Sequence, residues 1–412
     1  MPNSSLANQP AGPANSNVRG AGIPFLSSRL GIIILFLGFN YTLMGTVVYP
    51  ALPGIQARFH LTAAQLSLIA SLPALVSMSL QPVVGWVSDH VDRKVIVGLG
   101  LLAYALGGSL VGWVLLSTLT VYLLLLLGRA FTGLGELGAF PHYLAIIHTK
   151  LPAEKQQHML GIMDSLTSLG SVLAPLVGGM LAARSLALPF FATGVFALIA
   201  LALAWWAIPS LRAPKPTAAK AGPKHRFQFH FSYLGGSLVM GTLVSISTFL
   251  GSYAETEFGL NVTQVGLMLA VTPLAMAGGA VLAGRHGKDG YISTRNMVVA
   301  GGAGIAGLAL IGLARAPWVA AAGLLASGAV LGYWLTAFDH DAMSRGAPEL
   351  RGLRLSFFQQ AKAFGVLLFP FLLGLVIDAT GSIRPIYFLL AASHIAIGTV
   401  IFSYRARLTS VS

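Results

Sequence analysis

The sequence contains no cysteine and very little charge. Only 9% of its 412 residues are charged, whereas an ordinary soluble domain has roughly 25%. Without cysteine the chain can form neither a disulfide framework nor a thiolate metal site. Hydrophobic residues make up 55% of the chain, and a soluble protein could not bury so much apolar surface, because surface-to-volume scaling limits the buried fraction. These absences predict an integral membrane protein.

Acidic residues are scarce as well. The chain has 12 Asp and Glu against 25 Lys and Arg, which gives a formal net charge of +13. The bases lie in short segments between apolar runs, so they indicate membrane topology rather than a nucleic-acid surface. The sequence also lacks a phosphate-binding glycine loop and a nucleophile elbow, and its histidines are not grouped as metal ligands. We therefore expect no enzymatic chemistry, no metal, no cofactor and no nucleic-acid partner.

Twelve apolar runs follow one another along the chain. Each has about 20 residues, the length that crosses a hydrocarbon core of about 30 Å. They lie at 30–50, 66–87, 95–116, 120–147, 159–182, 187–208, 233–254, 263–284, 296–315, 317–340, 356–377 and 384–404. The predicted fold class is an all-α integral membrane protein with twelve transmembrane helices.

The distribution of bases predicts the orientation. With the N-terminus inside, nineteen bases fall on the inner side, and the outer side has only Arg58, Arg184, Arg315 and Arg384. The positive-inside rule then places both termini in the cytoplasm. Residues 1 to 24 lack the charged start, apolar core and cleavage site of a signal peptide. We expect a multi-pass protein of the bacterial inner membrane.

A long connection divides the spans into six and six. It contains four prolines and several lysines, which indicates a flexible basic tether held near anionic lipid. The expected organisation is a disordered cytoplasmic tail (1–28), a six-helix bundle (29–208), a basic linker (209–231), a second six-helix bundle (232–405) and a short cytoplasmic tail (406–412).

At the end of the second run and before the third, the sequence reads Gly85-Trp86-Val87-Ser88-Asp89-His90-Val91-Asp92-Arg93-Lys94 and contains a charged cluster. It resembles the loop between helices 2 and 3 of the major facilitator superfamily, Gly-x-x-x-Asp-Arg/Lys-x-Gly-Arg/Lys-Arg/Lys. His90 and Asp92 depart from that pattern. The resemblance implies a cytoplasmic gate formed by Gly85, Asp89, Arg93 and Lys94; an ordinary juxtamembrane charged turn is the alternative.

The resemblance implies two six-helix bundles with pseudo-twofold symmetry around a site near the middle of the membrane. A second copy of the loop motif is then expected after the eighth run. The segment there, Gly284-Arg285-His286-Gly287-Lys288-Asp289-Gly290, keeps glycines and bases but has no Asp in register.

The fourth run contains Arg129-Ala130-Phe131-Thr132-Gly133-Leu134-Gly135-Glu136. Arg129 and Glu136 are seven residues apart and therefore share one helix face. Charges inside a span face one another or a water-filled cavity, so a structural ion pair is one interpretation. The segment resembles the family motif Arg-x-x-x-Gly-x-Gly, whose arginine is associated with proton coupling. In that second interpretation Glu136 changes protonation, because desolvation favours its neutral form and the cation favours its ionised form.

The fifth run contains Gly170-Ser171-Val172-Leu173-Ala174-Pro175-Leu176-Val177-Gly178-Gly179. It is similar to the antiporter motif Gly-x-x-x-Gly-Pro-x-x-Gly-Gly, with Ala174 in place of the second glycine. Small residues at four-residue spacing allow close helix contact, and Pro175 bends the span. Asp164 in the same run is expected either to share proton or substrate binding with Glu136 or to cap the inner gate.

Further polar and aromatic residues lie within the spans. We expect Lys362 to pair with Asp339 or Asp341 as an inner latch, or to extend to the membrane interface. Asn40 either binds substrate or joins two helices by a hydrogen bond. Glu255, Glu257 and Asp378, at outer helix ends, are predicted to be solvated. The candidate residues of a central cavity are Asn40, Tyr41, Tyr333, Trp334, Gln359 and Gln360.

Together these motifs predict a secondary transporter that exports a small amphipathic solute, such as a drug, a siderophore or a secreted metabolite, in exchange for protons. We expect it to act as a monomer in the lipid bilayer. One alternative is an uptake symporter for an organic anion, with Arg129 and Lys362 as carboxylate binders. An alternative of another class is an uncoupled lipid flippase or a membrane sensor.

Overall fold

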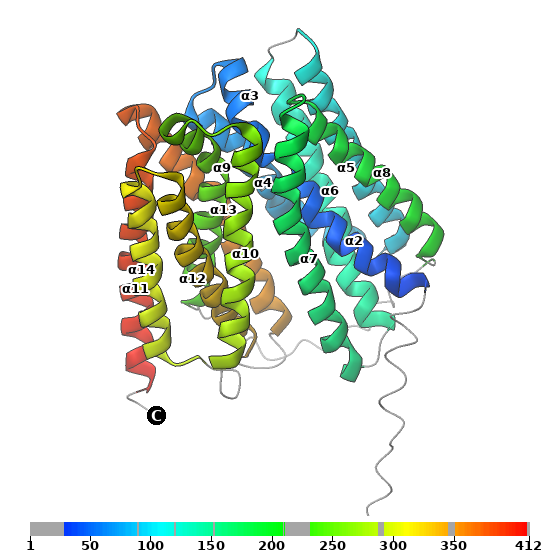
Figure 1. Ribbon diagram of the computed structural model, residues 1–412. Coiled ribbons are helices and arrows are strands. Elements are labelled where there is room, and N and C mark those ends of the chain that lie inside the picture. The colour runs from blue at the N-terminus through cyan, green and yellow to red at the C-terminus, as the bar shows by residue number, and fades with distance from the viewer. Residues whose placement is uncertain are drawn as a thin grey trace, which may run out of the picture.

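The computed structural model describes residues 29–88, 90–118, 121–150, 153–208, 210, 231–286, 292–344 and 351–409. Within these ranges the chain is helical and forms no strand (Figure 1). The predicted N-terminal tail, residues 410–412, most of the predicted linker and Asp89 lie outside the described residues. Residues 406–409 of the predicted C-terminal tail belong instead to a helix that ends at Thr409.

The first half of the chain starts with a span that is broken near its end. The break follows from Tyr49-Pro50, where a 3₁₀ turn with proline at its start separates two helices, because proline cannot donate the backbone hydrogen bond of a continuous helix. The elements are α2 (Arg29–Thr46), η2 (Tyr49–Ala51), α3 (Leu52–Phe59), α4 (Ala63–Ser88), α5 (Arg93–Leu116), α6 (Tyr122–Lys150), α7 (Ala153–Ala182) and α8 (Leu188–Ala207).

The second half consists of long helices only. These are α9 (Ser232–Phe258), α10 (Val262–His286), α11 (Thr294–Leu313), α12 (Pro317–Ser344), α13 (Arg351–Thr380) and α14 (Arg384–Thr409). Among the described residues, 11 helices are long and apolar enough to cross a membrane, and α6 with its 29 residues adds another long helix. The predicted all-α membrane fold is confirmed.

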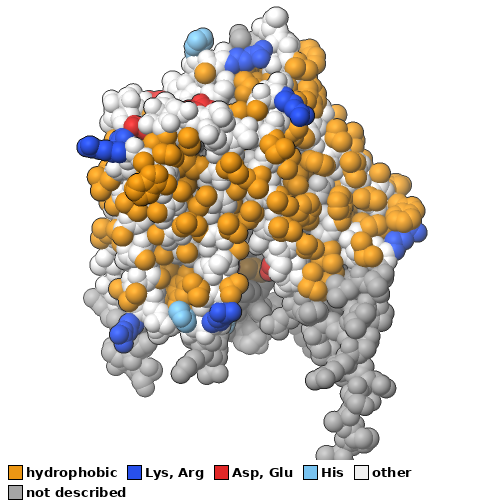
Figure 2. Space-filling view, in the orientation of Figure 1, with side chains coloured by type: hydrophobic (Ala, Val, Ile, Leu, Met, Phe, Trp, Pro, Cys, Tyr) orange, Lys and Arg blue, Asp and Glu red, His pale blue; other side chains and the backbone are white. Residues whose placement is uncertain are grey.

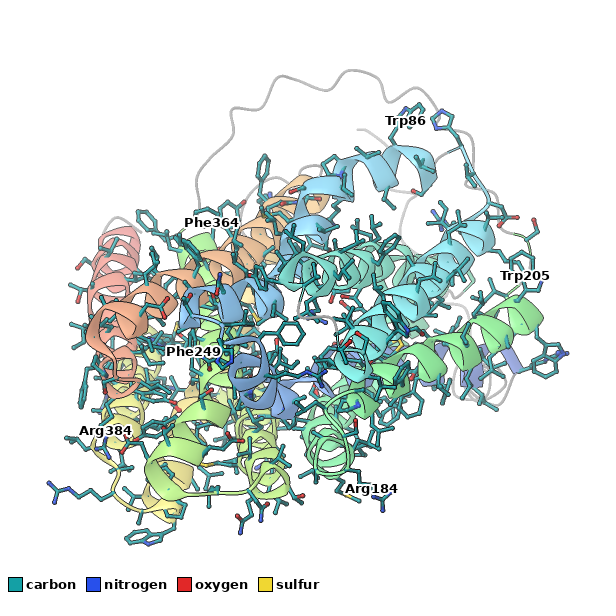
Figure 3. All side chains as sticks on the ribbon, turned by 90° about the horizontal axis from the view of Figure 1, so that it is seen from above. Trp86, Arg184, Trp205, Phe249, Phe364 and Arg384 are labelled. Atoms are coloured by element: carbon teal, nitrogen blue, oxygen red, sulfur yellow. The ribbon has the colours of Figure 1, made fainter. Side chains whose placement is uncertain are left out.

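Each half has its own buried core. Tyr104 and Met163 belong to a core cluster of the first half, whereas Trp334 and Phe358 belong to that of the second half. Seen from above, Phe249 points into the molecule, while Trp86, Trp205 and Arg384 lie at its periphery (Figure 3). Glycine brings helices together within a half: a Cβ on Gly100 of α5 would lie 2.5 Å from the Cα of Gly138 on α6. Small residues allow such backbone contact in membranes.

The two halves meet along two helix pairs, α7 with α10 and α4 with α13. At the α3 end the halves are in contact: Ser252 Oγ donates to Gln56 Oε1 at 3.1 Å, and a Cβ on Gly251 would lie 2.7 Å from Pro53 Cγ. At the opposite end, where α14 ends, the surface is hollowed between the halves, and an acidic side chain is visible in the hollow (Figure 2).

Asp378, near the end of α13, joins the two halves at the α3 end. Its Oδ1 accepts from the Ala63 N–H at 2.6 Å, and its Oδ2 accepts from the Ala64 N–H at 3.0 Å. The first N–H groups of a helix have no partner inside that helix, so a carboxylate of one half caps α4 of the other. Asp378 is exposed, as predicted, but its carboxylate also caps a helix of the other half, which the sequence does not show because the cap partner is 314 residues away.

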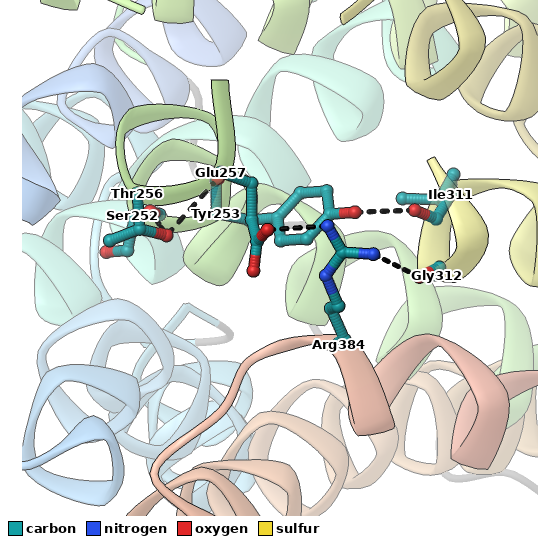
Figure 4. Close-up of polar contacts among 7 residues, drawn as sticks. All are labelled: Ser252, Tyr253, Thr256, Glu257, Ile311, Gly312 and Arg384. Atoms are coloured by element: carbon teal, nitrogen blue, oxygen red, sulfur yellow. Dashed lines mark hydrogen bonds and ion pairs between the residues drawn. The ribbon is translucent and has the colours of Figure 1, made fainter. Parts of the chain in front are cut away.

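Glu257 is also exposed, as predicted, and in addition it pairs with Arg384 at the start of α14. Arg384 Nη2 lies 2.5 Å from Glu257 Oε2, and Arg384 Nη1 donates to Gly312 O at 3.4 Å (Figure 4). Tyr253 Oη donates to the neighbouring Ile311 O at 2.7 Å. These contacts join α9, α11 and α14 at the α3 end.

Replacing Arg384 with Gln is expected to destabilise the protein by about 1 kcal/mol, because the ion pair is partly exposed and exposed pairs contribute little. The measurement is thermal unfolding of the purified protein in detergent. Arg315→Gln, a base at the same end with no ion pair among the described residues, is the control. Equal unfolding temperatures for the two variants would show that the Glu257 contact contributes nothing.

Candidate functional site

A cavity of about 540 Å³ lies between the halves. One wall, from the first half, is polar and is contributed mainly by α7. The facing wall, from α9, α10 and α12, is mostly apolar. The lining residues are Thr46, Tyr49, Asp164, Thr167, Ser168, Ser171, Pro175, Met240, Leu243, Val244, Ser247, Leu269, Pro273, Met276, Ala277, Ala280, Gly332, Leu335, Thr336 and Asp339. An apolar cavity with a few convergent polar groups is the usual form of a small-molecule site.

Two carboxylates line the cavity, one from each half. Asp164 on α7 is exposed to the cavity and forms no ion pair with any described residue. Asp339 on α12 accepts a hydrogen bond from Lys362 Nζ of α13 at 3.3 Å. The carboxylates of Asp164 and Asp339 interact electrostatically across the cavity. The Asp339 carboxylate is thus paired with Lys362, whereas the Asp164 carboxylate is available to a cation or a proton.

Arg129 is buried, with 6% of its surface exposed, and it contacts backbone rather than a carboxylate. Its Nε donates to Ile69 O at 2.8 Å, and its Nη2 to Ala70 O at 3.5 Å. Pro73 lies inside α4 and has no N–H, so the carbonyl four residues earlier, that of Ile69, loses its helical partner. Arg129 supplies the missing donor.

The glycines of the same motif explain how α6 approaches its neighbours. A Cβ on Gly133, one turn after Arg129, would lie 2.6 Å from Pro73 O, and a Cβ on Gly135 would lie 2.4 Å from Tyr104 Cδ2. Residues four apart share a helix face. Arg129 and Gly133 therefore both face the proline-containing part of α4, and Gly135 faces α5.

Glu136 lies two turns further along α6. Arg129, Tyr41 and Tyr104 are its electrostatic neighbours, but no described ion pair or hydrogen bond joins it to Arg129. Seven residues correspond to about 10 Å along the axis, and helical side chains lean toward the N-terminus, so Arg129 leans away from Glu136. The structural ion pair that the spacing allowed is not formed among the described residues.

The small residues of α7 form two contacts. A Cβ on Gly170 would lie 2.6 Å from Phe39 O, and one on Gly178 would lie 2.0 Å from Val47 O, so this face packs on α2 and on the turn that follows it. The adjacent face meets the other half: a Cβ on Gly179 would lie 2.9 Å from Val262 O of α10, and one on Gly266 would lie 2.4 Å from Pro175 O. The motif thus packs α7 within its half and against the opposite half.

Several predicted cavity residues serve packing instead. Asn40 is 2% exposed and donates to Phe196 O at 3.0 Å, the helix-joining role considered for it. Trp334 is 1% exposed, and its Nε1 donates to Met297 O at 3.0 Å. Tyr333 Oη lies 3.3 Å from His286 Nδ1. Asn40, Tyr333 and Trp334 thus have partners inside their own half, and sequence position does not show which way a helix is turned.

Gln360 was also expected in the cavity, as were Tyr41 and Gln359; none of the three belongs to the described lining. Gln360 Nε2 donates to Gln81 Oε1 at 3.1 Å and to Met78 O at 3.4 Å, which joins α13 to α4 across the halves. Met78 lies four residues before Pro82, the second proline inside α4. Met78 O therefore has no helical partner, and the Gln360 side chain of the opposite half supplies its hydrogen-bond donor.

The residues of the predicted cytoplasmic gate are only partly described. Gly85 lies in the last turn of α4, and Asp89 is outside the described residues. Asp92 caps α5, accepting from the Lys94 N–H at 2.9 Å and from Ser210 Oγ. Lys94 Nζ lies over the Trp205 ring of α8, 5.0 Å from its centroid. Asp341 is buried, at 5% exposure, and Lys362 contacts Asp339 instead.

The sequence matches the Major Facilitator Superfamily over residues 34–370. The chain belongs to this superfamily. It is 25% identical over 260 residues to the bacillibactin exporter of Bacillus subtilis, covering 60% of this chain and 65% of that protein. It is 25% identical over 169 residues to the quinolone resistance protein NorA of Staphylococcus aureus, covering 41% of each. The matched segments thus span less than two thirds of these relatives.

Solved structures show the same superfamily fold. A bacterial homologue of the human lysosomal transporter Spinster, in an inward-facing and occupied conformation, superposes with a TM-score of 0.77 at 16% identity, over 93% of this chain and 97% of that one. The nucleoside transporter NupG superposes with a TM-score of 0.71 at 12% identity, over 91% of this chain and 98% of that one. At such identities the likeness concerns the fold alone.

The hydroxyl groups of the cavity in this superfamily member were not anticipated. Thr167, Ser168 and Ser171 line it, and their hydroxyls donate to carbonyls three or four residues earlier, as Ser168 does to Asp164 O at 2.8 Å. Serine and threonine make this bond in many membrane helices, so their presence alone indicates no site. Their spacing after Asp164 was the available signal: 164, 168 and 171 share one helix face.

Proposed function

We propose that the protein is a secondary transporter that exports a small amphipathic organic solute in exchange for protons by alternating access. The observation that carries this proposal is the cavity between the halves, which has one unpaired carboxylate and an extended apolar wall. The relatives named as a bacillibactin exporter and a quinolone resistance protein support the direction of transport.

In the proposed orientation the α3 end faces outward and the hollow end faces the cytoplasm. The excess of bases at the hollow end supports this by the positive-inside rule. The structure then corresponds to an inward-open state of a monomer in the bacterial inner membrane. Closing the hollow end would bring the predicted gate residues Gly85 and Arg93 toward Asp339, Asp341 and Lys362 of the opposite half.

We assign proton coupling to Glu136 and Asp164. Asp164 lies where a solute would sit, and Glu136 lies within electrostatic range of tyrosines on α2 and α5. A carboxylate that forms no ion pair with the described residues can bind a proton in one conformation and release it in the other as hydration changes. In this proposal Arg129 has a structural role: it donates hydrogen bonds to α4 and does not bind the proton.

The contacts of the two basic residues disfavour the organic-anion symporter. That function would need Arg129 and Lys362 as carboxylate binders, but Arg129 donates to the α4 backbone and Lys362 is paired with Asp339. A solute carboxylate would have to displace both existing partners.

Replacing Glu136 with Gln is expected to remove solute-driven proton flux, because glutamine cannot bind and release a proton. The measurement uses proteoliposomes with a pH-sensitive dye and a panel of drugs, siderophores and organic acids. Glu255→Gln, a carboxylate near the end of α9 outside the cavity, is the matched control. Proton flux opposite to the solute in wild type supports antiport, and flux in the same direction would indicate a symporter. Absence of flux with every solute would favour the flippase or sensor.

A further inference from the structure

An apolar groove of about 650 Å³ lies on the outer surface of the first half, between α5 and α8. Its walls are formed by Val95 and Leu102 of α5 and by Leu198 and Leu201 of α8, and Trp205 lies at one end. The side chains that line the groove are apolar, and several are exposed: Leu198 is 50% exposed and Trp205 is 55% exposed. Figure 3 shows Trp205 pointing away from the molecule at the end of α8.

Glycine shapes the floor of this groove. Gly98 contributes no side chain, and a Cβ there would lie 3.4 Å from the Trp205 ring and 3.6 Å from Leu201 Cδ1. The segment from Val95 to Leu102 covers about 10 Å along α5. Half of a hydrocarbon core is about 15 Å deep, so the groove extends over most of one leaflet.

Two cations lie at the tryptophan end of the groove. Lys94 Nζ lies 5.0 Å from the centroid of Trp205, and the Arg29 guanidinium stacks on Trp206. The nearby Asp92 carboxylate already accepts from the Lys94 N–H and from Ser210 Oγ. Among the described residues neither Lys94 nor Arg29 forms an ion pair. Tryptophan is typical of the membrane interface, so the cations lie at headgroup level.

We propose that this groove binds one anionic glycerophospholipid, with its phosphate at Lys94 and Arg29 and an acyl chain along Gly98 to Leu102. The apolar length fits a chain of one leaflet, and the cations fit a headgroup with net negative charge. Zwitterionic lipids offer the same chains, so charge complementarity is what selects the anionic class. This site is distinct from the cavity between the halves and does not depend on the transported solute.

The test is native mass spectrometry of the full-length protein in detergent, titrated with phosphatidylglycerol or phosphatidylethanolamine. We expect one phosphatidylglycerol to be retained preferentially. Lys94→Gln should weaken its binding about fivefold, the effect of one base near an anionic headgroup. Arg295→Gln, an exposed base at the start of α11, removes the same charge away from the groove and should leave binding unchanged.

A second variant tests the groove itself. Gly98→Leu fills its floor and should reduce retention of both lipids, whereas Gly302→Leu on α11, where a Cβ would meet nothing within 4 Å, should not. Equal binding of the two lipids, or equal losses in Lys94→Gln and Arg295→Gln, would overturn the proposal. Unchanged retention in folded Gly98→Leu would also overturn it. If Gly98→Leu does not fold, the proposal is tested by phosphatidylglycerol retention in Lys94→Gln and Arg29→Gln. Both residues are at partly or fully exposed positions, where substitution is tolerated.

Discussion

Replacing Arg129 with alanine is expected to destabilise the protein by about 3 kcal/mol. A buried backbone acceptor without a partner costs roughly 1–3 kcal/mol. The cost is at the upper end here because the membrane interior has no water to replace the lost donor. The acceptor is Ile69 O, which receives Arg129 Nε at 2.8 Å. The measurement is thermal unfolding in detergent. Arg129→Lys, which keeps a charge but loses the planar donor group, should lose a large part of the same stability.

A double-mutant cycle distinguishes this role from a role in proton binding. In Pro73→Ala the residue at position 73 has an N–H that can bond to Ile69 O within α4, so Arg129→Ala should then cost about 1–2 kcal/mol less. Pro82→Ala is the matched control, because its freed carbonyl, Met78 O, is served by Gln360. If the effects of Arg129→Ala and Pro73→Ala on stability are additive, Arg129 does not stabilise the protein through its bond to Ile69 O.

Replacing Asp378 with alanine is expected to shift the protein toward the state open at the α3 end by about 2 kcal/mol, roughly 30-fold in the conformational equilibrium. The carboxylate accepts from two N–H groups of α4, which belongs to the opposite half, so separating the halves at that end would break both bonds. Loss of the cap removes an interaction of one state and leaves the other unchanged, which is the condition for a population shift.

The absence of cysteine in the natural chain provides the measurement. A single cysteine at Thr46, a cavity residue, can be labelled by an impermeant maleimide from the α3 side only when that end opens. Asp378→Ala should increase the labelling rate, and Asp378→Asn should have a smaller effect because an amide oxygen still accepts. Glu257→Gln is the control: this acid lies at the same end but pairs within its own half. Equal labelling rates for Asp378→Ala and wild type would contradict the cap as a latch.

The charged motif of α6 has one part that its own sequence determines and one part that depends on neighbouring helices. Spacing placed Arg129 and Glu136 on one face of a transmembrane helix, which is a local property of the chain. The partner of Arg129 is a carbonyl on α4, 60 residues earlier. A freed carbonyl could have been inferred from Pro73, because its cause is also local. The donor that would serve it depends on which helices become neighbours.

The acids show the same division. Asp164, Glu257 and Asp378 each occupy a predictable depth in their helices, but their surroundings differ. Asp164 lines the cavity, Glu257 meets Arg384, and Asp378 caps a helix of the other half. No pattern near these residues distinguishes the three situations, because each partner comes from a remote segment.

The sequence by itself determined the membrane-embedded all-α fold and the superfamily, because hydropathy, span length and motif spacing are properties of single helices. Only the tertiary structure decided which polar groups face the cavity, which carboxylate caps α4 and where a groove remains open. These outcomes depend on the rotation of each helix about its axis, and contacts such as Gly100 on Gly138 and Gly179 on Val262 set that rotation. Because such contacts join residues distant in sequence, the site exists only once both halves have packed.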